Sequence, residues 1–250
     1  MEKGKRLSVF FPAYLDEDNI GRVIEDAVLV LNGLKKETDL QDYEIIIIDD
    51  GSPDRTGEVA DSLIQKYPGI EIKVIHHNQN LGYGATLKTG FKNARYEYVF
   101  YSDGDYQFDL YDLKKLYALI PFSEIVAGFR IKKQCSNFKK LTSMAYNLFL
   151  KYLYRISGFA FIDVDCAFKI FKKEIFNRIK ISSNDAFIDA EIIIKSLLLG
   201  YKVTEVGVRH LPRSDGKTTA GAANLRIILK TIRDVRRLKR IINKSRSSKK

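Results

Sequence analysis

Four short apolar runs alternate with helix-like segments over the first hundred residues, and this alternation restricts the fold more than any other feature. The runs are 7–11, 43–48, 72–75 and 97–102, and each leads into a polar turn. Helices are expected from Asn19 to about Leu34, from Asp54 to about Tyr67, and from Gly82 to about Ala94. Strands and helices in this alternation form right-handed βαβ units. We therefore predict an α/β fold whose mostly parallel sheet is covered by helices on both faces.

The second half of the chain is less regular. Strands are expected at 124–128, 166–171 and 202–209, helices at 138–156 and 187–199, and a loop at 210–219. Together with the first half these segments predict a single domain over residues 1–223. Residues 224–250 are expected to form a separate basic helix and tail.

Composition excludes several classes of protein. The two cysteines, Cys135 and Cys166, form no CxxC pair, which argues against a disulfide framework or a structural zinc site and suits a cytosolic setting. No apolar run has the length of a signal peptide or of the roughly 18–20 residues that span a membrane. The hydrophobic fraction of 45% is ample for a sizeable core.

Three polar segments follow predicted strands of the first half, namely Pro12–Asn19, Asp49–Asp54 and Ser102–Gln107. The carboxyl ends of parallel strands lie along one edge of a sheet, where ligands of such folds bind. These segments are therefore expected to converge on one crevice.

Asp103, Asp105 and Gln107 are candidate metal ligands in the third segment. Two carboxylates and a side-chain amide are hard oxygen ligands that suit Mg²⁺ or Mn²⁺. A cation held there could stabilise a departing diphosphate. The alternative is a solvated turn, which an isolated Asp-x-Asp pair often forms.

Other residues of the crevice suggest a nucleotide site. Asp50 ends a strand and could accept hydrogen bonds from a uracil or guanine base, or could only cap its turn, while Tyr14 could stack on a base or line the sheet edge. The stretch Gly82–Lys88 opens a helix, and its N–H groups could face a donor. It lacks both the dinucleotide fingerprint and the P-loop pattern, so a simple tight turn is the alternative.

Seven motifs in order resemble the family 2 glycosyltransferases of the GT-A fold, most strongly the polyprenyl-phosphate sugar synthases of the dolichol-phosphate-mannose type. They are Phe11–Tyr14, Asp49–Asp54, Asn80–Ala85, Asp103–Gln107, Gly128–Arg130, Asp163–Phe168 and Arg213–Lys217, and the likeness extends over residues 7–219. Three positions depart from the family pattern, with Leu15 in place of Asn, Asp16 in place of Glu, and Ala167 in place of Gly.

The resemblance implies a metal-dependent hexosyltransferase with defined residue roles. It places Pro12, Tyr14, Asp16, Asp50, Gly82, Lys88 and Asp103 at a nucleotide diphosphate sugar. It places Asp103, Asp105 and Gln107 at Mg²⁺ or Mn²⁺, and Arg130, Lys140, Arg213 and Lys217 at an acceptor phosphate. Asp105, Asp163 and Glu191 are the implied catalytic residues.

The residues leave two acceptors open. A hydroxyl must lose a proton as it attacks and needs a base such as Glu191 or Asp163, whereas a lipid phosphate is already anionic and needs cations to hold it. The basic loops favour inverting transfer to a polyprenyl phosphate, dolichyl or undecaprenyl, at the cytosolic face of a membrane. Transfer to a saccharide or protein hydroxyl, as in cell-surface polysaccharide synthesis, is the alternative. A third alternative is a non-catalytic protein that binds a nucleotide sugar. Such a protein would not need the metal ligands, so their presence argues against it.

The C-terminal segment carries nearly all of the net charge of +11. Residues 224–250 hold eleven basic side chains and one acid, Asp234, and apolar residues recur at helical spacing between Leu225 and Ile242. Such a basic amphipathic helix can lie on an anionic membrane, where a membrane protein could be a further partner. The alternative is a helix that packs on the domain with its charges in water. Nothing in the segment resembles a nucleic-acid-binding module.

Overall fold

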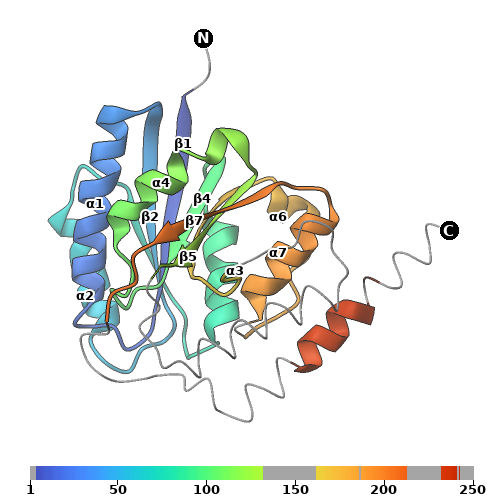
Figure 1. Ribbon diagram of the computed structural model, residues 1–250. Helices are drawn as coiled ribbons and strands as arrows, with labels where there is room; N and C mark the ends of the chain where they lie inside the picture. Colours follow the sequence, from blue (N-terminus) through green and yellow to red (C-terminus); the bar gives the residue numbers. More distant parts are fainter. Residues whose placement is uncertain (1–3, 132–161, 186, 213–231, 241, 243–250) are drawn as a thin grey trace.

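A seven-stranded sheet forms the centre of the computed structural model, which describes residues 4–131, 162–185, 187–212, 232–240 and 242 (Figure 1). Its strand order is β3-β2-β1-β4-β6-β5-β7, and only β6 runs antiparallel to its neighbours in this part of the chain. The strands are β1 (Lys5–Ala13), β2 (Leu40–Asp49), β3 (Ile72–His76), β4 (Tyr98–Ser102), β5 (Ile125–Arg130), β6 (Phe168–Lys172) and β7 (Val203–Val208). The predicted mostly parallel α/β architecture is confirmed.

Helices cover both faces of the sheet. The structure has α1 (Ile20–Glu37), α2 (Thr56–Lys66), α3 (Tyr83–Asn93), α4 (Leu113–Tyr117), α6 (Ile175–Arg178) and α7 (Ile188–Leu198), with 3₁₀ turns at Leu110–Asp112 and Ile120–Phe122. Figure 1 shows α1 and α2 on one side of the sheet, and α3, α6 and α7 on the other. The apolar stripe expected between Asn19 and Leu34 is buried along α1, and this burial against the sheet is what holds the helix in place.

Two strand boundaries differ from the prediction, and two short helices were not predicted. β1 continues through Pro12 to Ala13. The Pro12 carbonyl accepts from Gly104, so the side of Pro12 that lacks an N–H faces the turn after β4. Because β4 pairs with β1 only up to Phe10, the missing N–H removes no hydrogen bond between these strands. β6 begins at Phe168, because the N–H of Cys166 donates to the Asp163 carbonyl in a turn. The helices α4 and α6 are too short for a periodic apolar pattern to reveal them.

An aromatic cluster fixes β1, β4 and α3 against one another. The rings of Phe10 and Tyr101 stack with centroids 5.4 Å apart, and the Phe91 ring meets Phe10 edge-on at 5.0 Å. Tyr101 immediately precedes Ser102, the last residue of β4. The cluster therefore anchors the strand from which the predicted metal motif leaves the sheet.

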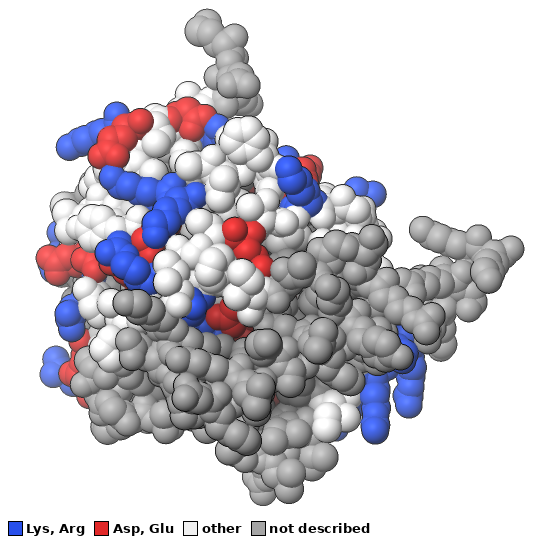
Figure 2. Space-filling view, viewed as in Figure 1, with Lys and Arg blue, Asp and Glu red and all other residues white. Residues whose placement is uncertain are grey.

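The C-terminal segment is described only in part. Residues 232–240 are helical, and Val235, Leu238 and Ile242 are buried while Arg233, Arg236, Arg237 and Arg240 are exposed. Figure 2 shows basic side chains projecting at the lower right, where Figure 1 has this helix. Burial of the apolar residues corresponds to the alternative in which the helix packs on the protein.

Other expectations lie outside the described residues. They are the helix at 138–156 and the side chains of Lys140, Arg213 and Lys217. In the portion of the chain that is described, no helix combines the length and the hydropathy required to cross a membrane.

Candidate active site

The three polar segments meet at the carboxyl edge of the sheet, as predicted. The N–H of Gly104 donates to the Pro12 carbonyl and the N–H of Asp50 donates to the Ala13 carbonyl, each at 3.0 Å. The N–H of Asp16 donates to Thr56 Oγ1 at 2.8 Å. The end of β1 therefore lies between the turns that follow β2 and β4, and all three segments lie together at this edge.

The Asp103–Gln107 turn has a tightly determined backbone. A Cβ on Gly104 would lie 2.8 Å from the Pro12 carbonyl oxygen, so only glycine fits this approach. Tyr106 has a φ of 59°, and its hydroxyl donates to Asp26 of α1 at 2.9 Å. The Arg22 guanidinium lies over its ring, 4.1 Å from the centroid. These contacts hold the left-handed conformation that a tyrosine rarely adopts.

The two acids of this turn fit a divalent cation. Asp103 Oδ1 is buried and has no hydrogen-bond partner among the described residues. Burial raises the pKa of Asp103 well above its usual range, and the charge of Asp105 raises it further. A cation between the carboxylates would relieve both effects. Among the described residues no three His, Cys, Asp or Glu side chains form a ligand set, and Mg²⁺ commonly takes one or two carboxylates together with substrate phosphates.

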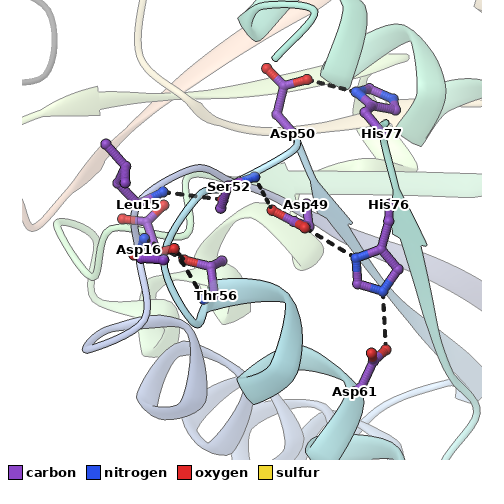
Figure 3. A network of polar contacts seen from close by, with 10 residues as sticks. Leu15, Asp16, Asp49, Asp50, Ser52, Thr56, Asp61, His76 and His77 are labelled. Carbon is purple, nitrogen blue, oxygen red and sulfur yellow. Dashed lines mark hydrogen bonds and ion pairs between the residues drawn. The ribbon is translucent and has the colours of Figure 1, made fainter. Parts of the chain in front are cut away.

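Asp50 has a structural role that the sequence did not reveal. Its carboxylate accepts from His77 Nδ1 at 2.6 Å, from the Leu81 N–H at 3.0 Å and from the Gly82 N–H at 2.9 Å, and Figure 3 shows the His77 contact. His77 Nε2 lies 3.0 Å from Thr89 Oγ1 on α3. Asp50 therefore fixes the loop between β3 and α3, and base recognition by Asp50 stays a prediction.

At the start of α3, two of the N–H groups that were expected to face a donor are engaged within the protein. The Gly82 N–H is taken by Asp50, and the Gly84 N–H donates to the Asn184 carbonyl at 3.0 Å. A Cβ on Gly84 would lie 2.4 Å from the Asn184 carbonyl carbon, which explains the glycine. This contact joins the first half of the chain to the loop before α7.

Lys88, a predicted donor ligand, lies beside the same loop. Its Nζ donates to Asn184 Oδ1 at 2.6 Å. Burial lowers the pKa of Lys88, and the charge of Arg237 contributes in the same direction. The helix at 232–240 therefore lies within electrostatic reach of the start of α3.

The segment after β1 folds around Asp16. The Tyr14 N–H donates to Asp16 Oδ2 at 2.9 Å, and Asp16 is buried. Leu15 between them has a φ of 59°, a conformation that asparagine tolerates better than leucine. Since the family pattern has Asn there, the backbone conformation explains that preference. Tyr14 is half-buried.

Asp49 belongs to a polar network next to Asp50. Figure 3 shows its carboxylate between the Ser52 N–H and His76 Nδ1, each at 3.0 Å, and His76 Nε2 reaches Asp61 at 3.1 Å. The hydrogen bond to Asp49 raises the pKa of His76. This network fixes the turn that carries Asp50.

Arg130 and Asp163 were predicted to bind an acceptor phosphate and to act as a base, and the structure pairs them with each other. Arg130 Nε lies 2.5 Å from Asp163 Oδ2, and a second guanidinium nitrogen lies 2.7 Å from Oδ1. Asp163 is buried and Arg130 nearly so. The fork uses two of the five donors of Arg130, which leaves the others for an anion.

Glu191, the other predicted base, is held in α7. Its carboxylate accepts from the N–H groups of Ser182 and Ser183 at 2.7–3.1 Å, and lies 2.5 Å from Lys195 Nζ. Burial raises the pKa of Glu191, but the hydrogen bond and charge of Lys195, together with the hydrogen bonds of Ser183, outweigh burial and bring the pKa below its usual range. A carboxylate with a lowered pKa is a weak base.

A second buried ion pair was missed from the sequence. Lys169 is fully buried, and its Nζ lies 2.5 Å from Asp189 Oδ1 and 2.5 Å from the Cys166 carbonyl oxygen. The Tyr101 hydroxyl donates to the same Asp189 oxygen. The trio joins β6, α7 and β4, and Tyr101 lies two residues before Asp103. The sequence signal was weak, because a lysine in a strand is usually exposed.

Known proteins share this sequence pattern and this fold. The family model "Glycosyl transferase family 2" matches residues 8–180. Dolichyl-phosphate beta-glucosyltransferase of Dictyostelium discoideum is 29% identical over 81% of the chain, and undecaprenyl-phosphate 4-deoxy-4-formamido-L-arabinose transferase of Edwardsiella ictaluri is 24% identical over 88%. The chain spans 65% and 64% of the length of these two relatives.

The fold likewise matches solved glycosyltransferase structures. Glucosyl-3-phosphoglycerate synthase from Mycobacterium tuberculosis, in complex with Mn²⁺ and UDP-glucose, superposes with a TM-score of 0.66 at 16% identity. The match covers 93% of this chain and 79% of that one, so the two proteins share the GT-A fold. Because the family model matches well over half of its residues, the chain belongs to glycosyl transferase family 2.

Proposed function

We propose that the protein transfers a sugar from a nucleotide diphosphate sugar to the phosphate of a polyprenyl phosphate, with inversion in one displacement. The choice of acceptor rests on the ion pairs of Asp163 and Glu191. A carboxylate that is paired with a cation is a poor general base for a hydroxyl acceptor. A phosphate dianion needs no base to attack. The relatives named for dolichyl and undecaprenyl phosphate support the same acceptor class.

The residues of the crevice have complementary tasks in this reaction. Tyr14 and Asp50 would bind the base, and Pro12, Asp16, Gly82 and Lys88 would border the donor. Asp103 and Asp105, with Gln107 nearby, would hold Mg²⁺ or Mn²⁺, which supplies positive charge to the departing nucleoside diphosphate. Arg130 would bind the acceptor phosphate through the donors that Asp163 does not use, with Lys140, Arg213 and Lys217 as further candidates.

The acceptor can be tested directly. Purified protein with Mn²⁺ and radiolabelled UDP-glucose or GDP-mannose should label a short polyprenyl phosphate and leave the dephosphorylated polyprenol unlabelled. The matched pair differs only in the phosphate, so equal labelling of both lipids would contradict a phosphate acceptor. Labelling of a saccharide or peptide alone would establish the hydroxyl-acceptor alternative.

The arginine face of the helix at 232–240 is proposed to hold the protein on the cytosolic face of a membrane. Arg233, Arg236, Arg237 and Arg240 are exposed, whereas Val235 and Leu238 are buried. Attraction between these four charges and anionic headgroups, rather than insertion of the apolar stripe, would then supply the affinity. The lipid acceptor would be reached from that surface.

Replacing the four arginines by glutamine should reduce binding to vesicles that contain phosphatidylserine by at least about tenfold, because each basic residue near such a surface contributes about 1 kcal/mol. Vesicle co-sedimentation at low and high salt would measure the effect, which salt should diminish. The matched control replaces four exposed lysines, Lys35, Lys36, Lys66 and Lys92. Equal losses in the two variants would show that total charge, and not this helix, determines binding.

A further inference from the structure

Asp165 lies at the same edge of the sheet as the metal motif, although its strand, β6, runs in the opposite direction to β4. β4 and β6 pair antiparallel with Ser102 opposite Phe168. Asp105 follows Ser102 by three residues and Asp165 precedes Phe168 by three, so both leave the paired ladder at one edge. The charge of Asp189 raises the pKa of both Asp103 and Asp165, as expected for two acids at one edge.

The acids around Asp165 are already engaged. Asp163 is bound by Arg130 and Asp189 by Lys169. Glu205 accepts from the N–H groups of Ile162 and Asp163 at 2.9–3.3 Å. Each of these carboxylates has partners within the protein that account for its burial.

Asp165 differs from its neighbours because its Oδ1 is buried and finds no hydrogen-bond partner in the part of the chain that the structure describes. Burial, followed by the charge of Asp189, raises the pKa of Asp165 to about 7. Leaving a carboxylate oxygen buried without a hydrogen bond is costly, so a group that donates to it is expected. A sugar hydroxyl is a neutral donor that satisfies a carboxylate without adding charge to an acidic region.

We propose that Asp165 contacts the donor, with Oδ1 accepting a hydrogen bond from a hydroxyl group of the sugar that is transferred. The inference rests on the proposed function, because it requires a sugar attached to a diphosphate at the Asp103–Asp105 edge. It adds a residue that recognises the sugar itself, whereas the roles given above concern the base, the diphosphate and the acceptor.

Donor binding tests this assignment without turnover. The donor is UDP-glucose, or GDP-mannose if the wild type prefers it. Calorimetric titration of the donor in the presence of Mn²⁺ should show that Asp165→Ala lowers the binding affinity by about ten- to a hundredfold. Affinity for the matching nucleoside diphosphate, which has no sugar, should change less than twofold. This difference between the two ligands would not arise from a general loss of structure. Asp165→Asn, which keeps one acceptor oxygen, provides a milder variant if the alanine protein is unstable.

Control variants and outcomes separate this inference from the proposed function. Glu205→Gln alters a neighbouring acid with partners of its own and should leave the ratio of the two affinities unchanged. If Asp165→Ala weakened binding of the nucleotide sugar and of the nucleoside diphosphate equally, the proposed sugar contact would be wrong. An unchanged affinity for the nucleotide sugar together with a lower kcat would also overturn it, and would indicate that Asp165 acts as a base. If the wild type binds no nucleotide sugar, the proposed function itself fails, and the inference fails with it.

Discussion

Replacing Asp105 by asparagine should lower kcat/KM for sugar transfer at least about a thousandfold. The substitution keeps the size of the side chain and its acceptor oxygen for the Gln107 N–H, a contact of 3.1 Å. It removes one of the two carboxylates that would hold the cation, whose stabilisation of the leaving diphosphate is worth several kcal/mol. Transfer assays over a range of Mn²⁺ concentrations would measure the loss.

Metal binding alone provides the independent measurement for Asp105. Titration with Mn²⁺ and UDP should show weakened metal binding in Asp105→Asn, while thermal unfolding stays close to that of the wild type. Chelation should abolish wild-type transfer, and added Mg²⁺ or Mn²⁺ should restore it. Asp18→Asn, at an exposed position after β1, is the matched control and should retain activity. Full turnover by Asp105→Asn at ordinary metal concentrations would remove Asp105 from the metal site.

Lys169→Met should destabilise the fold by about 3–5 kcal/mol, because it leaves Asp189 buried without its counter-charge. Urea unfolding followed by circular dichroism would give the change in the free energy of unfolding. The double variant Lys169→Met/Asp189→Asn should recover part of this loss, since it removes the uncompensated charge. The two single variants and the double variant form a cycle that isolates the pair.

A neighbouring lysine supplies the comparison for Lys169. Lys172 lies on the same strand and is 3.3 Å from Glu124, but the two side chains are 33% and 28% exposed. An ion pair this close to water contributes at most about 1 kcal/mol, so Lys172→Met should cost far less. Similar losses for Lys169→Met and Lys172→Met would show that burial of the Lys169–Asp189 pair is not what makes it important.

The sequence predicted the first half of the site well because strand direction determines where the loops go. Once 7–11, 43–48 and 97–102 are parallel strands, their following turns must share an edge, and the contacts of Gly104 and Asp50 confirm this. The structure adds the reason for individual residues, such as the positive φ of Leu15, which no periodicity reveals.

The second half was less predictable because its contacts are long-range. Nothing in the local pattern shows that β6 is antiparallel, and this orientation brings Asp165 and Lys169 to the site. Asp163 and Glu191 resemble free acids in the sequence, and only the fold shows their cations, Arg130 and Lys195. The partner of a charged side chain can lie far away in the sequence, as Arg130 does from Asp163.

The strand order has a consequence for synthesis on the ribosome. β5 emerges before β6, yet in the described sheet β5 joins β4 only through β6. The nascent chain can assemble β3, β2, β1 and β4 early, but the free edge of β4 then has to wait until residues 168–172 have left the exit tunnel. During that interval the apolar strand 98–102 is exposed to pairing with other chains. Insertion of β6 closes this edge and brings Asp165 and Lys169 to it, so the protein gains its protection against aggregation and these residues of its candidate active site in the same folding step.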